Sequence, residues 1–569
     1  MKERQIKKCQ NCQTEFTIEP EDFDFYEKIK VPAPTFCPDC RLIRRLAFRN
    51  EWYLYKRKDD LTDKEIVSLY PSDSPFPVYN YKDWRAQERW NPMDYARDYD
   101  WSRPFLEQFK ELTNKVPRYN VFSEMSVGCE YCGLSYNAKN CYLSIAAACE
   151  DCAYISGYQS KNCFDAMLWK SENCYEVIDG DNSYNLIFSQ DSDNCLDSAF
   201  LFDCHNCQNC FFCVGLRNKK YHIFNKSYTA KEYKEKIKEY DLGSFQNLLK
   251  LQKEFQEFKL KFPHRFARIF KSVNCTGDDI GNSKNCHCCF RTRYGVEDSK
   301  YIYGGGLNLK ETYDSFDAGQ DGQLMYEGHG VNGYQVFFSR HIIEGRNVYY
   351  SDECFNCHDI FGCAGLKNKS YCILNKQYTK EEYERMLPKV IQHMNDAPYV
   401  DKKGRIYRFG EFFPMELSPF SYNESDAQDF FPLTKKEAEE KGYQWRDIAK
   451  YQNDHKPTIK AADLPDNIKE VGESIINEVI ECQSKNQCFG NGVFRIIPME
   501  FNFLKKYSIA LPRKCPDCRR RDRMQKRNPL KLWHRKCQNR GCPNEFETPY
   551  SPERKEMVYC EKCYQKEVI

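Results

Sequence analysis

The stretch KNCYLSIAAACEDCAYISGYQSKNCFDAMLWKSENCYEV, residues 139–177, carries the clearest period in the chain. In it Cys141, Cys152, Cys163 and Cys174 recur every eleven residues, and three of the four stand in an Asn-Cys-(Tyr/Phe) triplet. Short apolar or aromatic runs alternate with Asn, Asp, Ser and Gly, as in short strands separated by turns. The period predicts a solenoid of parallel strands in which like residues stack, with two eleven-residue units making a coil of 22 residues. The alternative is two compact β-rich domains without a solenoid.

The middle of the chain is duplicated. Residues 204–233 align without a gap on residues 354–383, with GLRNK in one copy and GLKNK in the other. Both copies then carry a Thr-x-x-Glu capping box, at Thr229 and Thr379, which predicts that a helix begins at each. We therefore expect two related β-rich halves, each closed by a helix.

The second copy follows the period less strictly than the first. Cys275 and Cys286 keep the spacing of eleven residues, and Tyr301, Tyr313 and Tyr326 then take over as the recurring residues. The second half is therefore expected to be the less regular solenoid.

The two ends of the chain also match each other. Residues 16–50 align without a gap on residues 494–528, including CPDCR at 37–41 and at 515–519. Two Cys-x-x-Cys-like knuckles brought together supply the four ligands of a zinc tetrahedron. The knuckles predict three such sites: Cys9, Cys12, Cys37 and Cys40; Cys482, Cys488, Cys515 and Cys518; and Cys537, Cys542, Cys560 and Cys563.

All three sites offer four thiolates and leave no place for water, so we expect three structural zinc ions rather than catalytic ones. Iron is the alternative metal for a tetrahedron of four cysteine sulfurs. Each first knuckle is followed by a hairpin-like run and each second knuckle by helix-forming sequence, which is the order of the treble-clef class. Each ion is expected to fold its own small module.

The helix expected after the second knuckle of each copied module carries arginines at i, i+4 and i+8, which share one helical stripe. Although the chain is nearly neutral, with 85 basic and 83 acidic side chains, such a local stripe predicts contact with nucleic-acid phosphates, most plausibly RNA. The alternative is that the first arginine pairs with a neighbouring aspartate and the rest form a solvated face. The stripes are Arg41, Arg45 and Arg49, and Arg519, Arg523 and Arg527.

A further group of cysteines leaves several interpretations open. Cys204, Cys207, Cys210 and Cys213 have the spacing of an iron–sulfur motif, but Ile360 replaces one of the four in the internal copy. A zinc site made by three of them is a second interpretation. Stacked, buried cysteines are favoured, because free cysteine is among the most buried residue types. The same question applies to Cys354, Cys357 and Cys363.

Composition limits where the chain is expected to work. The sequence begins MKERQIKKCQNCQ without the apolar core of a secretory signal, and no run is apolar enough to span a membrane. We therefore expect a cytoplasmic protein with no membrane partner. Its 32 cysteines are then metal ligands or small buried side chains rather than disulfides.

Five segments match a known family: FCPDCRLIRR…FRNE (36–51), KNCYLS (139–144), GLRNKKYHIFNKSYTAKEY (215–233), SPFSYNES (418–425) and ETPYSPERKEMVYCEKCYQKEV (547–568). Over nearly its whole length the chain resembles an uncharacterised cysteine-rich zinc-binding family of reduced-genome, uncultivated bacteria. The resemblance implies treble-clef or zinc-ribbon modules and little more. Some members carry a CaiB/BaiF CoA-transferase label, for which this sequence offers no motif.

The predicted fold is mostly β with α, a duplicated parallel β-solenoid-like middle flanked by treble-clef zinc modules. We expect a multi-module binding or scaffold protein that contacts RNA, the ribosome or another protein. The alternative is an enzyme of unknown reaction with its site on the solenoid face, although no catalytic residue can be assigned. The predicted units are a zinc module (1–58), a linker with a helix (59–122), two β-rich repeats each with its helix (123–262 and 263–396), a linker or helical region (397–480), the second zinc module (481–536) and the third (537–569).

Overall fold

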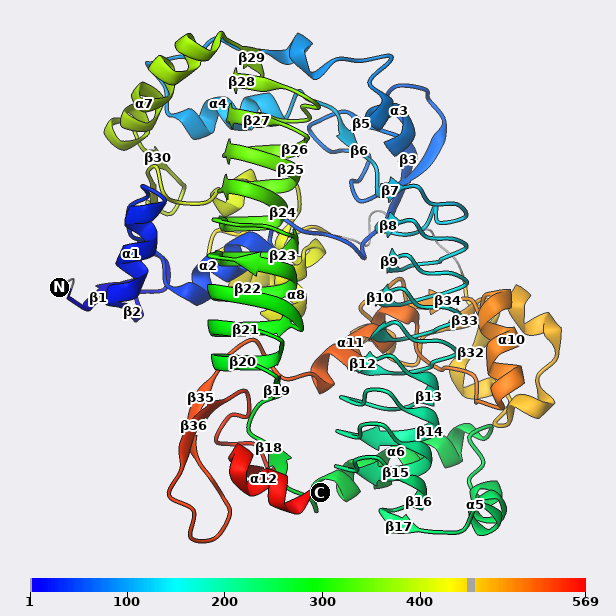
Figure 1. Cartoon of the computed structure of the whole chain (residues 1–569). Coiled ribbons are helices and arrows are strands. Elements are labelled where there is room, and N and C mark those ends of the chain that lie inside the picture. Colours follow the sequence, from blue (N-terminus) through cyan, green and yellow to red (C-terminus); the bar gives the residue numbers. More distant parts are fainter. Residues whose placement is uncertain (1–2, 448–455, 569) are drawn as a thin grey trace.

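The computed structural model describes residues 3–447 and 456–568, and two parallel β-solenoids lie side by side at its centre (Figure 1). The first solenoid spans residues 122–227 and the second spans residues 269–377. Their coils advance in opposite directions, the first downward and the second upward in Figure 1. The mostly β architecture with a duplicated solenoid middle is confirmed.

The strands of the first solenoid are short, and those of the second are longer. The first contains β7 (Phe122–Glu124), β8 (Leu134–Tyr136), β9 (Ile145–Ala147), β10 (Ser156–Tyr158), β11 (Met167–Trp169), β12 (Ile178–Asp181), β13 (Tyr184–Ile187), β14 (Leu196–Phe202), β15 (Gln208–Val214), β16 (Lys220–Ile223) and β17 (Lys226–Ser227). The second contains β19 (Ile269–Phe270), β20 (Val273–Gly281), β21 (Lys284–Thr292), β22 (Tyr294–Lys310), β23 (Tyr313–Gln320), β24 (Tyr326–Phe337), β25 (Arg340–Tyr349), β26 (Asp352–Phe355), β27 (His358–Phe361), β28 (Ser370–Ile373) and β29 (Lys376–Gln377).

A whole coil of the first solenoid takes about half the expected number of residues. Ile145 pairs with Ser156, its neighbour one coil further on and eleven residues later. Asn140, Leu143 and Ala148 have left-handed φ angles of 52°, 43° and 52°, so the chain turns three sharp corners within one coil. One eleven-residue unit therefore closes the coil, and the expectation of 22 residues was wrong.

The narrow coil explains the cysteine content of the first solenoid. Its interior is filled largely by Cys, Ala, Val, Leu and Ile, and the Cys163 thiol donates to the carbonyls of Lys161 and Ser171, at 3.2 and 3.5 Å. In the second solenoid the repeat lengthens to thirteen residues between Lys300 and Tyr313, and the core gains more Ile, Val and Leu as well as Met. The core side chains are thus larger where the coil is longer.

Each residue of the Asn-Cys-aromatic triplet has a separate role. Asn162 occupies a left-handed corner (φ 50°) and donates its amide to Asn173 of the next coil. Asn tolerates this conformation better than most residues. Cys163 points inward and is fully buried. Phe164 points outward, and its ring centroid lies 4.8 Å from that of Phe503 in a neighbouring module.

The C-terminal end of each solenoid is closed in the same way. An antiparallel pair, β16–β17 in one and β28–β29 in the other, ends the stack. A helix follows with the predicted capping box, formed by Thr229 before α5 (Ala230–Lys236) and by Thr379 before α7 (Lys380–Asp396). Both predicted helix starts are confirmed.

The tyrosines expected to continue the period do so only in part. Tyr313 and Tyr326 are paired in register, as predicted. Tyr301 lies one position out of register, because its neighbour Lys300 is the partner of Tyr313.

The remaining elements belong to the ends of the chain and to the connections. In the N-terminal half they are β1 (Gln5–Lys8), β2 (Glu15–Ile18), α1 (Pro20–Lys28), α2 (Pro38–Leu46), β3 (Tyr55–Lys58), β4 (Glu65–Ser68), β5 (Val78–Tyr79), α3 (Tyr81–Ala86), α4 (Phe105–Thr113), β6 (Arg118–Tyr119), α6 (Phe245–Lys259) and β18 (His264–Arg265). In the C-terminal half they are β30 (Tyr399–Val400), β31 (Ile406–Tyr407), α8 (Asp426–Phe430), α9 (Lys435–Glu440), β32 (Ile459–Lys460), β33 (Ile480–Glu481), β34 (Val493–Phe494), α10 (Pro498–Tyr507), α11 (Pro516–Lys526), β35 (Trp533–Lys536), β36 (Glu545–Thr548), β37 (Val558–Tyr559) and α12 (Glu561–Glu567), with short 3-10 turns between them. None of the described helices combines the length and the apolar character needed to cross a membrane.

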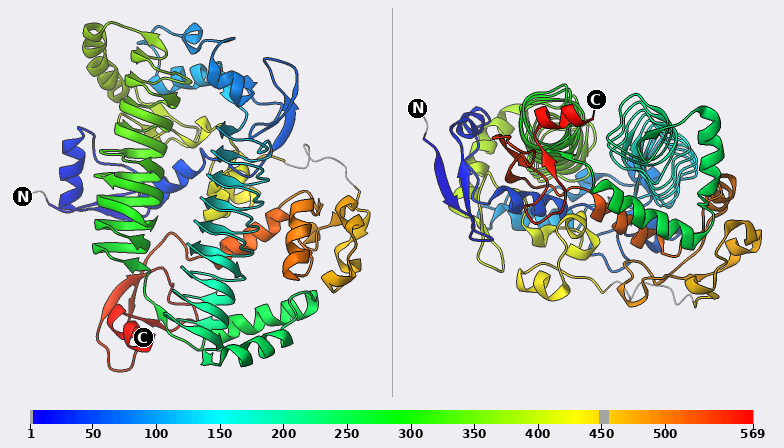
Figure 2. Two further views of the ribbon diagram at one scale, coloured as in Figure 1. Left: turned by 45° about the vertical axis from the view of Figure 1, so that its right-hand side comes forward. Right: turned by 90° about the horizontal axis from the view of Figure 1, so that it is seen from below.

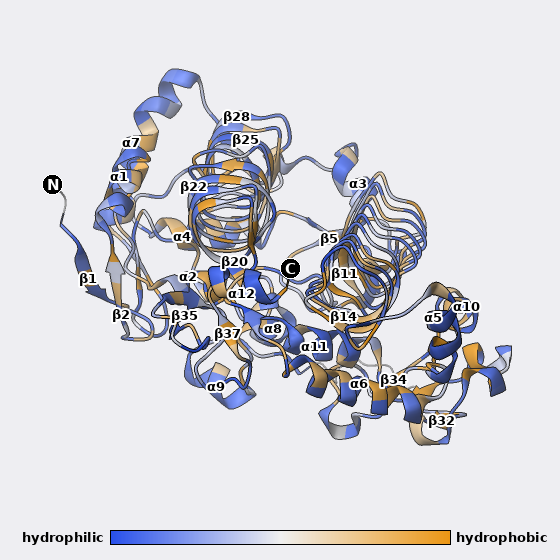
Figure 3. Cartoon of the chain, turned by 60° about the horizontal axis from the view of Figure 1, so that its bottom comes forward, coloured by the Kyte–Doolittle hydropathy of each residue, from blue (hydrophilic) through white to orange (hydrophobic). Residues whose placement is uncertain are grey.

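The duplicated end modules pack crosswise on the solenoids. Helix α2, near the N-terminus, contacts β23 and β24 of the second solenoid, whereas the C-terminal module with α10 and α11 shares a core with the first. Seen from below or tilted, α2, α8 and α11 lie along one side of the solenoid pair (Figures 2 and 3). Each module is therefore attached to the solenoid that is more distant in sequence.

Candidate functional site

The three predicted cysteine quartets all come together, with the four sulfur atoms of each within 4.8 Å of one another. The Sγ atoms of Cys12 and Cys37 are 3.6 Å apart. Those of Cys542 and Cys560 are 3.8 Å apart. Because metal–sulfur bonds of about 2.3 Å in a tetrahedron place the sulfurs about 3.8 Å apart, each quartet fits a metal ion.

Local structure positions the sulfur ligands of the N-terminal quartet. The first knuckle lies in the turn between β1 and β2, and Cys37 is the residue that caps the start of α2. A helix N-terminus favours the thiolate form of cysteine. The Asn11 amide lies 3.2 Å from the Cys40 sulfur, where it can donate to it. Such outer contacts orient and stabilise metal ligands.

The arginine stripe of α2 faces the second solenoid rather than solvent. Arg41 donates to Asp314 at 2.8 Å. Arg45, with 0% of its surface exposed, lies 3.3 Å from Asp314 and 3.2 Å from Glu327. Arg49 contacts Asp317 at 2.7 Å. Burial raises the pKa of Glu327, and the adjacent guanidinium groups oppose that rise.

The stripe of α11 repeats this arrangement on the first solenoid. Arg523 donates to Asp165 at 2.7 Å, Arg519 also contacts Asp165, and Arg527 donates to Asp179 at 3.0 Å. Asp165 precedes Asp314 by 149 residues, which is close to the 150-residue offset of the duplication. The acidic partners were missed in the sequence, although their recurrence at this offset is a signal that could have found them.

These contacts correct the expectation of an exposed phosphate-binding surface. Five of the six stripe arginines are at most 7% exposed, and the side chain of Arg527 is 11% exposed. Their carboxylate partners lie mainly on the solenoids, not on the neighbouring aspartates of their own helices that the alternative interpretation named. The guanidinium groups bind the modules to the solenoids and are not free for a polyanion.

The second group of cysteines belongs to the solenoid cores. Cys204 and Cys213 are fully buried, and the Cys204 thiol donates to the carbonyls of Phe202 and Cys213, both at 3.5 Å. Among the described residues, only the three terminal quartets bring potential ligands close enough for a metal. The favoured interpretation, stacked buried cysteines, is confirmed here and for Cys354, Cys357 and Cys363, which are also buried.

A groove of about 310 Å³ lies where the two solenoids and the metal-module helices meet. We call it the inter-solenoid groove. Its charged lining residues are Arg49, Glu51, Asp179, Arg291, Asp317, Asp426, Asp429, Arg520 and Arg527. In the described part of the chain, every carboxylate of this set lies within 4 Å of an arginine.

Arg291 is the exception among the groove arginines. No carboxylate lies within salt-bridge distance of it in the described structure, and its guanidinium lies 5.6 Å from the ring centre of Phe430. Burial and the neighbouring Arg527 lower the pKa of Arg291 to about 9. The groove therefore offers one incompletely neutralised cation.

One wall of the groove carries a column of aromatic side chains. Parallel pairing aligns Tyr136, Ala147, Tyr158 and Trp169 on successive coils of the first solenoid. Tyr136 and Tyr158 are 44% and 40% exposed. Ala147 leaves a notch between their rings, and neighbouring coils are about 4.8 Å apart. Exposed rings at regular spacing are suited to contact with an extended ligand.

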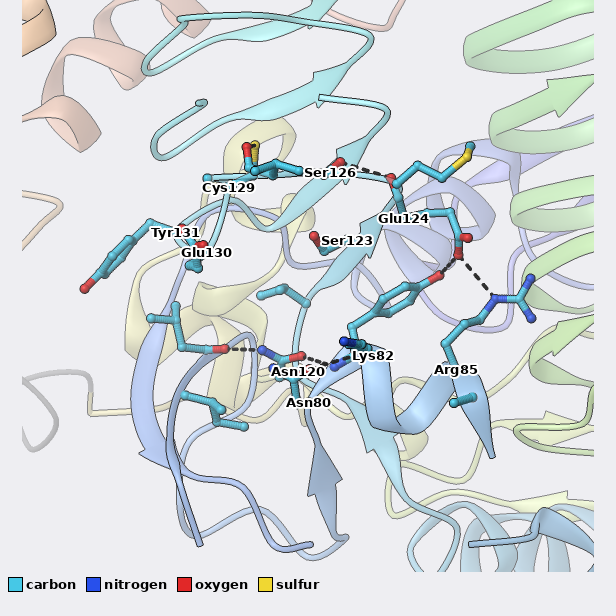
Figure 4. A pocket seen from close by; sticks show the side chains of 18 of the residues that line it. Asn80, Lys82, Arg85, Asn120, Ser123, Glu124, Ser126, Cys129, Glu130 and Tyr131 are labelled. Carbon is cyan, nitrogen blue, oxygen red and sulfur yellow. Dashed lines mark hydrogen bonds and ion pairs between the residues drawn. The ribbon is translucent and has the colours of Figure 1, made fainter. Parts of the chain in front are cut away.

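A larger cavity, of about 1310 Å³, lies at the start of the first solenoid (Figure 4). We call it the end pocket. The first coil, α3 and the β3–β4 hairpin surround it. Glu124 accepts hydrogen bonds from Tyr81 and Arg85, and Asn120 donates to the backbone of Val67. These contacts fix one wall of the pocket.

Comparison with known proteins adds no assignment. No protein-family model matches the chain, and no curated protein matches it. One solved structure, described as a "putative acetyltransferase" from Desulfovibrio desulfuricans G20, shares 9% identity over 50% of this chain and 86% of its own, with a TM-score of 0.11. A similarity of that size carries no argument about fold or activity.

Proposed function

We propose that this chain is a zinc-stabilised scaffold protein that binds a partner in the inter-solenoid groove. The single observation that carries the proposal is the exposed aromatic column, which lies where both solenoids and both duplicated end modules meet. The end modules hold the solenoids in place through buried ion pairs and thereby build the groove.

Binding is favoured over catalysis by the state of the groove carboxylates. A general base or nucleophile needs a free carboxylate or an activated side chain beside it. Each described groove carboxylate instead lies beside an arginine. Burial raises the pKa of Asp426 to about 7, but Arg49 is its closest charged partner, at 3.5 Å. One such carboxyl without a paired nucleophile supports the enzyme alternative only weakly.

A protein partner is favoured over RNA or the ribosome. Nucleic-acid binding draws its affinity from unneutralised basic side chains along the phosphate path. The six stripe arginines on which the RNA expectation rested are engaged with carboxylates, and Arg291 alone remains. A polypeptide with apolar or aromatic side chains and one acidic residue opposite Arg291 fits the groove better.

For the metal we propose zinc, held by treble-clef modules. The sulfur–sulfur distances, the closed set of four thiolates and the hairpin-then-helix order support this assignment. Elemental analysis of the purified chain should find three zinc ions per molecule. Fewer than two, or iron in place of zinc, would remove the proposal.

The groove proposal can be tested by site-specific photocrosslinking in the native cell. Benzoylphenylalanine placed at position 158 should give a protease-sensitive, nuclease-resistant adduct. The same group at Tyr184, which is 45% exposed and outside the groove, is the matched control. A nuclease-sensitive adduct at 158 would restore the RNA interpretation. No adduct, or equal adducts at both positions, would rule out the groove as the binding surface.

A further inference from the structure

The first coil of the first solenoid leaves one strand edge unpaired. β7 is the terminal strand of its sheet and pairs with β8. The bridge between Val127 and Lys139 connects the same coil to the next one, again on the β8 side. Among the described residues, no strand or bridge pairs with the opposite edge. An open edge presents a row of backbone donors and acceptors.

Hydrogen bonds show which backbone groups face outward. Phe122 donates its N–H to the carbonyl of Gly133, and the carbonyl of Glu124 accepts from Asn137. Successive residues of a strand direct their backbone groups to opposite neighbours. Ser123, between these two residues, therefore directs its N–H and C=O away from β8.

The open edge borders the end pocket, as Figure 4 shows for Ser123, Glu124 and Ser126 on the strand side and Asn80 and Lys82 on the opposite side. The adjoining Met125 and Val127 are 63% and 73% exposed. Apolar side chains beside an unpaired edge are an aggregation hazard unless something covers them.

The other solenoid ends are closed by the chain itself. β17 and β29 turn back as antiparallel strands at the two C-terminal ends. At the start of the second solenoid, the Arg265 guanidinium lies 4.6 Å from the ring centre of Phe270 in the first strand. The end pocket is thus the place where a solenoid end faces a large cavity.

We infer that the end pocket binds an extended segment of another polypeptide, which adds to β7 as one further parallel strand. Backbone hydrogen bonds to Ser123 supply affinity, and the segment covers Met125 and Val127. Small inward side chains and an Asn or Asp corner define the class of segment, because these features let the coils of this chain stack on one another. The site is separate from the inter-solenoid groove.

The test uses a synthetic peptide that copies residues 134–145, with serine at position 141 and a fluorescein label. Zinc-loaded, full-length protein is titrated into it and fluorescence anisotropy is followed. Ser123→Pro removes the outward donor and leaves both flanking bonds to β8, whereas Ser123→Ala keeps the donor. We expect saturable binding, a Kd at least about tenfold higher for Ser123→Pro, and an unchanged Kd for Ser123→Ala.

A second measurement covers the case in which Ser123→Pro does not fold. Hydrogen–deuterium exchange of the wild type should slow in residues 122–128 when the peptide is added. Absence of saturable binding, equal binding of a shuffled peptide, equal affinity of the proline and alanine variants, or unchanged exchange would each overturn the inference. None of these outcomes depends on the groove, so the groove proposal is tested separately.

Discussion

At the residue scale, charge inside the protein decides what the arginines do. Arg45 and Arg523 hold equivalent positions in the two end modules, and each is at most 1% exposed. Each contacts a fully buried aspartate, Asp314 or Asp165. Spacing along the sequence shows correctly that the arginines share one helical face. It cannot show that face to be buried, because the acidic partners lie more than 250 residues away.

The buried ion pairs give the first residue-scale prediction. Arg523→Met removes the cation and leaves Asp165 buried with less compensation, so we expect a loss of about 3–5 kcal/mol in the free energy of unfolding. Lys139→Met, which breaks an exposed pair with Glu150, is the control and should change little. Urea unfolding followed by circular dichroism measures both. Equal small effects would show that the buried pair does not anchor the module.

Histidine burial gives a prediction about pH. His329 is fully buried and stacks on Phe316 with ring centroids 5.7 Å apart. In the described structure neither ring nitrogen has a hydrogen-bond partner, and burial and the nearby Arg49 lower the pKa of His329 well below 6.5. The unfolded chain therefore binds more protons below about pH 6.5, so stability falls as pH falls, by at most about 1.4 kcal/mol per pH unit.

Replacing the ring tests that sign. His329→Phe keeps an aromatic ring in the stack and removes the titrating group, so the unfolding midpoint should fall less between pH 7 and pH 5 than it does in the wild type. Thermal unfolding over that range is the measurement. A steeper fall in the variant, or parallel curves, would contradict the assignment.

At the scale of elements, the corner residues are what the eleven-residue period encodes. Asn162 and Asn173 continue a ladder in which a corner amide donates to the next coil, as Asn140 does to Asp151. The sequence predicts the period, the parallel stacking and the helix caps, because each depends on local spacing. It does not predict the coil length, because the left-handed corners that shorten the coil are occupied by residues as different as Asn, Leu and Ala.

The corner ladder predicts an ordered effect of substitution. Asn162→Ala loses the amide bond and places an unfavourable residue at a left-handed φ, so we expect a cost of about 1–3 kcal/mol. Asn162→Gly loses the bond but accepts the backbone conformation, so it should cost less. Chemical unfolding of both variants measures the difference. A glycine variant less stable than the alanine variant would contradict the role given to the corner.

At the scale of the whole molecule, the duplication extends to the contacts between its parts. Phe25 stacks on Tyr313 in one half, and Phe503 lies against Phe164 in the other. The end modules were expected to fold independently, each around its own zinc. Crosswise docking couples each of them to a solenoid instead, and no local sequence signal reveals which solenoid it contacts.

Hydrogen–deuterium exchange of the zinc-ligand variants Cys37→Ser and Cys515→Ser tests this crosswise architecture most directly. Loss of the N-terminal site should speed exchange in residues 313–327 of the second solenoid and leave residues 164–179 protected. Loss of the site near the C-terminus should do the reverse. Faster exchange confined to the altered module, or found in the solenoid nearer to it in sequence, would contradict the account.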